Sequence, residues 1–337
     1  MSEQPIAWGA EALWEQLVAL LPGLSVEIVP RTSSTNTALL ERARIGLNGP
    51  GHDPTHPPAH DATYDASLHA AAADPDAPAF GRRSADLQPC LLVAEHQTGG
   101  RGRQGKRWQS APGASLTFSV LLPLARSDWS GLSLALGVAL ADALDPPHPA
   151  RPPRIGIKWP NDLWLLDSPL GARDMAAPDA VTAGAVDAPA AAPRGRKLGG
   201  ILIETVATGA HRLAIAGVGL NVLPLDMPDA AASSGYACLQ EIDPNASAPG
   251  ALAQVAEPMA RALRRFEREG YAPFAAGFAA RDLLRGCRVQ TTLPAVPEGV
   301  AGGVTAQGAL RVLTAAGWND VASGEVSVRL PDAAPPC

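Results

Sequence analysis

The sequence lacks the features that mark several protein classes. Its four cysteines, Cys90, Cys238, Cys287 and Cys337, lie far apart and form no C-x-x-C pair. This spacing argues against a zinc site or a disulfide framework and suits a reducing, cytoplasmic location. No stretch has the length and apolarity of a membrane span, and residues 1–30 lack the basic start of a signal peptide. The net charge of −6 argues against a polyanion partner, so we expect neither DNA nor membrane binding.

Two stretches lack apolar periodicity. Residues 48–89 are rich in Pro, His, Asp and Ala, and residues 171–196 consist mostly of Ala, Pro, Asp and Gly. Neither offers an apolar face to bury, so we interpret both as insertions into a folded domain. The first stretch contains four histidines, and a solvated loop explains them better than a metal cluster does.

The rest of the chain alternates helical and strand patterns. Helical spacing is found at 10–21, 130–144 and 249–270, with a short helix at 38–43. Apolar runs predict strands at 25–29, 90–94, 115–122, 155–165 (interrupted by a turn), 197–204 and 211–222. Short β-rich runs at 288–293, 308–314 and 325–330 predict a small C-terminal β-barrel.

Glycine and cationic residues are densest in residues 99–108. Four glycines alternate there with Arg101, Arg103, Lys106 and Arg107 before Trp108. Glycine lets a ligand approach the backbone, and arginine suits carboxylate and phosphate, so this loop can close on an anion. The string resembles a dinucleotide fingerprint and a P-loop. However, no helix follows it, and an arginine replaces the P-loop Ser or Thr. A basic surface hairpin without a ligand is the alternative.

Four further polar groups are candidates for a site, and three of them allow two interpretations each. Residues 32–37 can cap a helix or line a polar pocket, and the turn at 160–162 can be turn chemistry or a site for magnesium. Lys197 is predicted to head its strand beside two glycines that allow a close neighbour. Gly219 and Asn221 end a strand, either as bulge residues or beside a backbone-lined pocket.

The order of these motifs resembles that of the biotin protein ligases. The motifs are Ser34-Thr35-Asn36, Gly100-Arg101-Gly102-Arg103-Gln104-Gly105, Lys158-Trp159-Pro160-Asn161-Asp162, Lys197-Leu198-Gly199-Gly200 and Gly217-Val218-Gly219-Leu220-Asn221. The resemblance implies an α+β fold, with a mixed sheet flanked by helices and then a small SH3-like β-barrel. It implies a catalytic domain over 1–284, containing both insertions, and the SH3-like domain over 285–331.

The resemblance also implies a two-step activity. Biotin and ATP give biotinyl-5′-AMP, and the biotinyl group passes to a lysine of a biotin carboxyl carrier protein, such as that of acetyl-CoA carboxylase. By position in the motifs, the biotin-binding residues are Ser34, Thr35, Asn36, Gln97, Arg101, Gly102, Arg103 and Lys197. The nucleotide-binding residues are Lys106, Trp108, Asn161, Asn221 and Tyr236. The catalytic residues are Lys197, Arg103 and Asp162. The residues that would bind Mg²⁺ are Asn161, Asp162 and Asn221.

Three other functions are weighed against this one. A lipoate ligase shares the fold family, but the glycine-arginine loop favours biotin. Some biotin ligases also repress transcription through a winged helix-turn-helix domain. Fewer than about thirty residues precede the first matched strand here, so we expect a ligase without that domain. Lys197 and Asp162 argue against a protein that only sequesters biotin. The oligomeric state stays open, a homodimer included.

Overall fold

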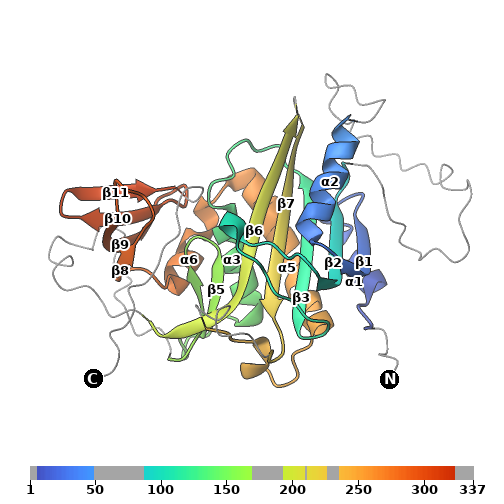
Figure 1. Ribbon diagram of the computed structural model, residues 1–337, viewed down its shortest axis with the longest axis horizontal. Coiled ribbons are helices and arrows are strands. Elements are labelled where there is room, and N and C mark those ends of the chain that lie inside the picture. Colours follow the sequence, from blue (N-terminus) through green and yellow to red (C-terminus); the bar gives the residue numbers. More distant parts are fainter. Residues whose placement is uncertain (1–5, 49–86, 169–192, 209–210, 226–234, 323–337) are drawn as a thin grey trace, which may run out of the picture. The chain divides into compact units, whose positions relative to one another are not determined.

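The computed structural model describes residues 6–48, 87–168, 193–208, 211–225 and 235–322 (Figure 1). Its helices include α1 (Ala10–Leu17), α2 (Thr35–Asn48), α3 (Leu132–Leu144), α5 (Ala248–Glu269) and α6 (Ala275–Arg281). The strands of its larger sheet are β1 (Ser25–Thr32), β2 (Cys90–Gln97), β3 (Ser115–Pro123), β4 (Ile155–Lys158), β5 (Asp162–Leu166), β6 (Gly195–Thr208) and β7 (His211–Asn221). Most of the two predicted insertions lies outside the described residues.

The larger sheet is mixed, as the sequence predicts. Its strand order is β1-β2-β3-β7-β6-β5-β4. Strand β1 runs parallel to β2, whereas β2–β3, β4–β5 and β5–β6 are antiparallel pairs. Every residue of β3 except Pro123 is buried. A strand buried on both faces gives a continuous apolar run, which is why the sequence located β3 closely.

Contacts within the chain define two compact units, and strands β6 and β7 contribute to both. The first unit holds residues 1–112, 116–127 and 202–218. In its core, Leu39 and Ala43 of α2 belong to one buried apolar cluster with Leu92 and Ala94 of β2 and Leu213 and Ile215 of β7. This cluster fixes the start of α2 against the sheet.

The second unit holds residues 113–115, 128–201 and 219–337, and its two longer helices pack together. Helix α3 buries most of its residues, as its all-round apolar pattern predicts. Helix α5 buries one apolar face, and on its exposed face Arg261 and Arg265 pair with Glu257 and Glu269, four residues away. Pro258 lies inside α5 without ending it.

A separate antiparallel sheet follows α6 in the second unit. Its strands are β8 (Arg288–Gln290), β9 (Glu298–Val304), β10 (Leu310–Thr314) and β11 (Gly317–Val321), in the order β11-β10-β9-β8 (Figure 1). This pairing is consistent with an SH3-like domain. The sequence did not predict β9 and β11. Strand β9 holds three glycines, and β11 holds a glycine, an asparagine and an aspartate, all of which are poor strand formers. The run predicted at 325–330 lies outside the described residues, and the domain boundary near residue 284 stays a prediction.

The turn between β4 and β5 contacts this smaller sheet. The buried Trp159 donates from Nε1 to the carbonyl of Gly308 at 3.0 Å, and Gly308 packs against Gly131 at the start of α3. Ser133 Oγ donates to the carbonyl of Pro160 at 2.9 Å. The turn that carries Asn161 is therefore held from two sides by elements of the same unit.

The sequence shows neither a membrane span nor a disulfide framework, and the structure bears on both. Of the helices in the described ranges, none combines the length and apolarity needed to cross a membrane. The three described cysteines, Cys90, Cys238 and Cys287, are buried and form no disulfide.

Candidate functional site

Ser34 begins helix α2 as its N-terminal cap. Its carbonyl accepts from the Ala38 N–H at 2.9 Å, and its Oγ accepts from the Thr37 N–H at 3.4 Å. The first is the first backbone hydrogen bond of the helix, and the second satisfies an N–H group that the first turn leaves without an intrahelical partner. The helix-cap interpretation of this motif is confirmed, although the helix begins at Thr35 and not at Ala38.

The side chains after this cap form a buried hydrogen-bond cluster. Gln97 Oε1 accepts from the Thr35 N–H at 2.7 Å and from Thr35 Oγ1 at 3.2 Å. Ser119 Oγ of β3 lies 2.6 Å from Thr35 Oγ1 and donates to Asn36 Oδ1 at 2.6 Å. All four residues are at most 9% exposed. Burial of polar groups is costly unless they bond one another, so these contacts fix each side chain in one orientation.

Glu204 of β6 joins this cluster to the glycine-arginine loop. One carboxylate oxygen accepts from Asn36 Nδ2 at 3.0 Å, and the other accepts from Arg101 Nη2 at 2.9 Å. Arg101 also donates from Nη1 to Thr37 Oγ1 at 3.2 Å. Gly217 of β7 packs so closely against the Asn36 amide that a Cβ at this position would overlap it. We call Ser34, Thr35, Asn36, Gln97, Arg101, Ser119 and Glu204 the polar cluster.

The glycine-arginine loop is a hairpin. Arg101 and Arg107 form an antiparallel bridge, and the Gly102 N–H donates to the carbonyl of Lys106 at 2.7 Å. At the tip, Gln104 has a positive φ of 55°, and Gly105 has a φ of 72°. Five predicted residues, Arg101, Gly102, Arg103, Lys106 and Trp108, lie on this hairpin, and Lys106 is exposed. The hairpin geometry is what the basic-hairpin alternative predicts. It leaves the closing of the loop on an anion as a prediction.

In the second unit, Lys197 and Asp162 form an ion pair between β6 and β5. Lys197 Nζ lies 2.8 Å from Asp162 Oδ1, and the two side chains are 30% and 21% exposed. Gly200 pairs with Asp162 in the sheet, and a Cβ on Gly200 would lie 3.2 Å from Asp162 Oδ1. The prediction that Lys197 heads its strand is wrong. Gly195 begins β6, so residues 195 and 196 belong to the strand and not to the second insertion.

Two predicted asparagines fix the backbone around this pair. Asn221 Nδ2 donates to the carbonyl of Lys197 at 3.2 Å and to that of Ala237 at 2.9 Å. Asn161 Nδ2 donates to the carbonyl of Ile201 at 2.7 Å. Because each amide nitrogen donates to backbone carbonyls, each amide group is held in one orientation, with its oxygen turned away from those carbonyls.

Tyr236 lies beside Lys197 in this arrangement. The two residues form a parallel bridge, and the Ala237 N–H donates to the carbonyl of Lys197 at 3.0 Å. Tyr236 Oη donates to the carbonyl of Leu223 at 2.7 Å. Burial raises the pKa of the Tyr236 phenol to about 12, with smaller contributions from Cys238 and Glu241. The phenol therefore stays protonated at neutral pH, and the structure brings Tyr236, Asn221 and Lys197 together.

Arg196 clamps the segment that follows Tyr236. Its guanidinium binds both carboxylate oxygens of Glu241, at 3.1 and 2.8 Å, and donates to the carbonyl of Tyr236 at 3.1 Å. Burial by itself would raise the pKa of Glu241. Hydrogen bonds from Arg196 and from the Cys238 N–H outweigh it and hold that pKa below its usual value.

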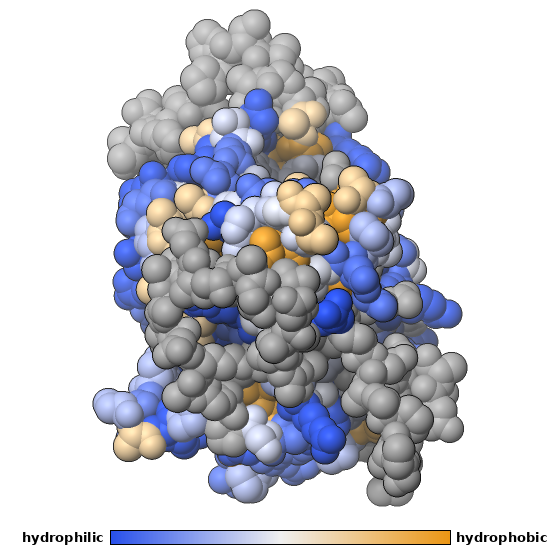
Figure 2. Space-filling model, turned by 90° about the vertical axis from the view of Figure 1, so that its left-hand side faces the viewer, coloured by the Kyte–Doolittle hydropathy of each residue, from blue (hydrophilic) through white to orange (hydrophobic). Residues whose placement is uncertain are grey.

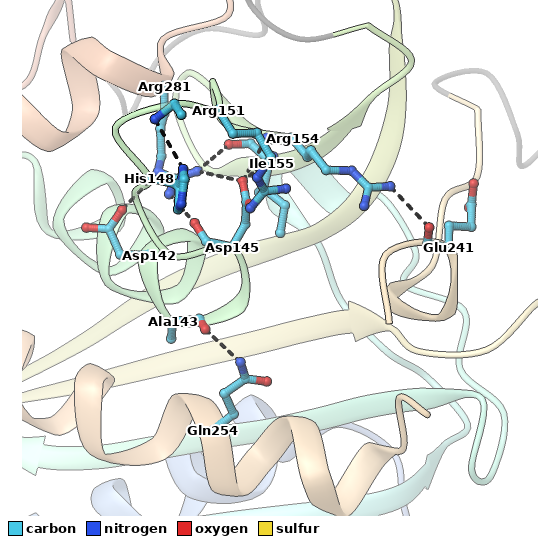
Figure 3. A network of polar contacts seen from close by, with 11 residues as sticks. Asp142, Ala143, Asp145, His148, Arg151, Arg154, Ile155, Glu241, Gln254 and Arg281 are labelled. Atoms are coloured by element: carbon cyan, nitrogen blue, oxygen red, sulfur yellow. Dashed lines mark hydrogen bonds and ion pairs between the residues drawn. The ribbon is translucent and has the colours of Figure 1, made fainter. Parts of the chain in front are cut away.

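A cavity of about 260 Å³ lies elsewhere in the second unit, between the end of α3 and the start of α5. Asp145, Arg151, Arg154 and Gln254 are among its lining residues, which include none of the predicted site residues. Figure 3 shows the network beside it, in which Asp145 accepts from Arg151, from the backbone of Arg154 and Ile155, and from Arg281. Arg154 also donates to the carbonyl of Glu241 at 3.1 Å. These polar groups are hydrogen-bond partners of one another, and the network joins the end of α3 to β4 and α6.

Sequence reasoning missed four residues of these arrangements: Ser119, Glu204, Arg196 and Glu241. Ser119 lies inside the strand predicted at 115–122 and Glu204 ends the strand predicted at 197–204, so neither has a local signal of its own. Strand alternation offered a signal for Arg196, since neighbours in a strand point to opposite faces. Among the described residues, no group of three or more His, Cys, Asp or Glu could hold a metal.

Comparisons with known proteins agree with this geometry. Residues 83–221 match the model of the biotin/lipoate A/B protein ligase family. A biotin--[acetyl-CoA-carboxylase] ligase from Mycobacterium tuberculosis is 30% identical over 318 residues, which cover 90% of this chain and 85% of that protein. The matched family region contains the hairpin, the turn at 160–162 and Lys197.

Two further comparisons extend the match. The bifunctional ligase/repressor BirA of Escherichia coli is 29% identical over 241 residues, which cover 70% of this chain and 65% of that protein. The structure of a biotin protein ligase from Aquifex aeolicus in complex with biotin and ATP has a TM-score of 0.58 at 20% identity. That alignment covers 91% of this chain and 99% of that one, and it shows a shared fold. The 30% identity along nearly the whole chain, with the family's motifs in order, shows that this chain belongs to the biotin protein ligases of the biotin/lipoate A/B protein ligase family.

Proposed function

We propose that this chain activates biotin with ATP and transfers the biotinyl group to a lysine of a biotin carboxyl carrier domain. In the first step, a biotin carboxylate oxygen attacks the α-phosphorus of ATP. The bond from that phosphorus to the bridging oxygen breaks, and pyrophosphate leaves with the electron pair. In the second step, the carrier lysine amine attacks the acyl carbon, AMP leaves, and the amine loses a proton. An amide forms and no redox partner is needed.

The Lys197–Asp162 pair is the observation that carries this proposal. Two anions, a carboxylate and a triphosphate, must meet in the first step, and a fixed cation reduces their repulsion where charge develops. Asp162 holds Lys197 Nζ at 2.8 Å, so the ammonium is oriented before any ligand binds. Both side chains remain partly exposed, which leaves the ammonium accessible.

We assign biotin to the polar cluster. The bicyclic ring system of biotin is uncharged and has one polar edge, so it needs oriented donors and acceptors, and Thr35, Asn36 and Gln97 are held in single orientations by their neighbours. Ser34 and Arg101 belong to the same cluster and keep their predicted biotin roles. Gly102 and Arg103 would act from the hairpin, with Arg103 retaining the reactive anhydride rather than forming it.

We assign ATP to the neighbours of Lys197 in the second unit. Tyr236 offers a ring for the adenine, and Asn161 and Asn221 present amide oxygens. The nucleotide contacts that the resemblance implies for Lys106 and Trp108 of the hairpin stay predictions. The donor set of Asn161, Asp162 and Asn221 holds one carboxylate, which does not suit a resident metal. It does suit Mg²⁺ that arrives on the phosphates, because that ion uses few protein ligands. When bound, Mg²⁺ neutralises phosphate charge.

The test is pyrophosphate release with MgATP and either biotin or lipoate. We expect release that depends on biotin, followed by biotin on a purified carrier domain and not on a carrier whose target lysine is replaced by arginine. Pyrophosphate release with lipoate and not with biotin would indicate that this chain is a lipoate ligase of the same family. Release with neither acid would refute both.

A further inference from the structure

Glu204 is an acidic side chain beside a proposed site for an anionic substrate. It lies on β6 with 18% of its side chain exposed, and it bridges two elements far apart in the chain. Asn36 Nδ2 donates to one of its oxygens at 3.0 Å, and Arg101 Nη2 donates to the other at 2.9 Å. Without a neutralising partner, the Glu204 carboxylate would repel the carboxylate of biotin. An acidic residue at this position therefore needs a functional explanation.

We infer that Glu204 is a positioning residue for biotin binding, which orients the Asn36 amide and docks Arg101 against the polar cluster. This inference rests on the proposed function. Glu204 has two acceptor oxygens, and both of the donors that it contacts are needed in the polar cluster. Its ion pair with Arg101 also cancels the repulsion that the carboxylate alone would exert on an anionic ligand.

The amide orientation follows from the same bond. Asn36 Nδ2 donates to Glu204 and to the carbonyl of Leu202, which leaves Asn36 Oδ1 to accept from Ser119 Oγ. If the amide were reversed, its oxygen would face two acceptors and its nitrogen would face Ser119. Glu204 therefore selects the orientation that a ligand meets in the polar cluster.

Docking of the hairpin depends on the second bond. The Arg101 side chain is 46% exposed and reaches Glu204 and Thr37, both in the first unit. Arg101 begins the antiparallel bridge at the base of the hairpin, so fixing its side chain limits the movement of the loop. The neutral amide of Glu204→Gln offers one acceptor and a donor group, so it can satisfy only one of the two partners.

The experiment compares wild type, Glu204→Gln and the matched control Glu257→Gln. The control also removes a glutamate that pairs with an arginine, in this case Arg261 on the exposed face of α5. For Glu204→Gln we expect KM for biotin to rise at least tenfold, with KM for ATP and kcat at saturating biotin within threefold of wild type. Trypsin should cleave the 101–107 hairpin at least fivefold faster. The control should match wild type in every measurement.

Three further variants, Arg101→Gln alone, its combination with Glu204→Gln, and Glu204→Asp, keep the inference testable. In Arg101→Gln combined with Glu204→Gln, the rise in KM for biotin should be smaller than the product of the two single rises, since the two side chains share one contact. Glu204→Asp keeps both acceptor oxygens and serves if the glutamine variant does not fold, with an expected rise of at least threefold. An unchanged KM for biotin, equal rises in both KM values, or unchanged cleavage would each overturn the inference. If wild type releases no pyrophosphate with biotin, the proposed function fails instead, and the cleavage measurement still tests the docking of Arg101.

Discussion

Replacing Lys197 with glutamine separates the chemistry of this protein from its stability. Lys197 Nζ lies 2.8 Å from Asp162 Oδ1, and both side chains are partly exposed. An ion pair in this setting contributes about 1 kcal/mol or less to folding. A fixed cation beside the phosphorus, where negative charge develops, lowers the activation free energy by about 3 kcal/mol. We therefore expect biotin-dependent pyrophosphate exchange to fall by about two orders of magnitude, while the melting temperature moves by no more than about 4 °C.

The control for this variant is Lys158→Gln. Lys158 ends β4 and pairs with Asp162 across the turn between β4 and β5, and its ammonium lies 4.8 Å from the centre of the Trp164 ring. This change also removes one positive charge from the second unit, so it reproduces any general electrostatic effect. We expect it to keep at least a third of the wild-type exchange rate. If Lys197→Gln also exchanged within threefold of wild type, the assignment of Lys197 to the first step would be refuted.

Three further variants test other parts of the reasoning. Arg103→Gly should still form the adenylate but release it sooner, so that biotin spreads to an unrelated lysine-rich protein on a streptavidin blot; an unchanged adenylate off-rate would show that Arg103 does not retain it. Gly217→Ala should displace the Asn36 amide and raise KM for biotin about tenfold, and an unchanged KM would remove Asn36 from the site. Asp145→Asn removes one of the two carboxylates, those of Asp145 and Asp142, that pair with the buried Arg281, and should cost about 2 kcal/mol in unfolding free energy, measured by urea denaturation at pH 7.

The pH dependence of that last variant has a definite sign. Burial by itself would raise the pKa of Asp145, but hydrogen bonds from the backbone of Ile155 and Arg154 and from Arg281 outweigh it and lower that pKa. A lowered pKa contributes stability that is present above the unfolded value of about 3.9 and is lost as pH falls through the folded value. The difference between wild type and Asp145→Asn should therefore shrink below about pH 4. A constant difference down to pH 2 would contradict this cause.

The sequence predicts the elements of this fold better than their contacts. Periodicity located β3 and α3 closely because nearly every residue in them is buried, and burial leaves a continuous apolar pattern. Strands β9 and β11 escaped prediction because their residues are poor strand formers, and their pairing with β10 depends on tertiary contacts that no local window contains. The resemblance predicts roles for Asn36, Gln97 and Lys197, whereas Glu204 and Ser119 are found only in the structure, as hydrogen-bond partners of Asn36.

Burial separates the ion pairs that stabilise the second unit from the pair assigned to chemistry. Arg281 and Asp145 are 2% and 4% exposed, and Arg281 also donates to two backbone carbonyls, so a ligand cannot reach either group. Lys197 and Asp162 are 30% and 21% exposed, and the glycine at position 200 leaves room beside both side chains. A partly exposed pair loses little when one partner turns toward a new anion, because water already screens the contact. For that reason we assign Lys197 to the substrate and Arg281 to the fold, although each is an ordinary cation held by an aspartate.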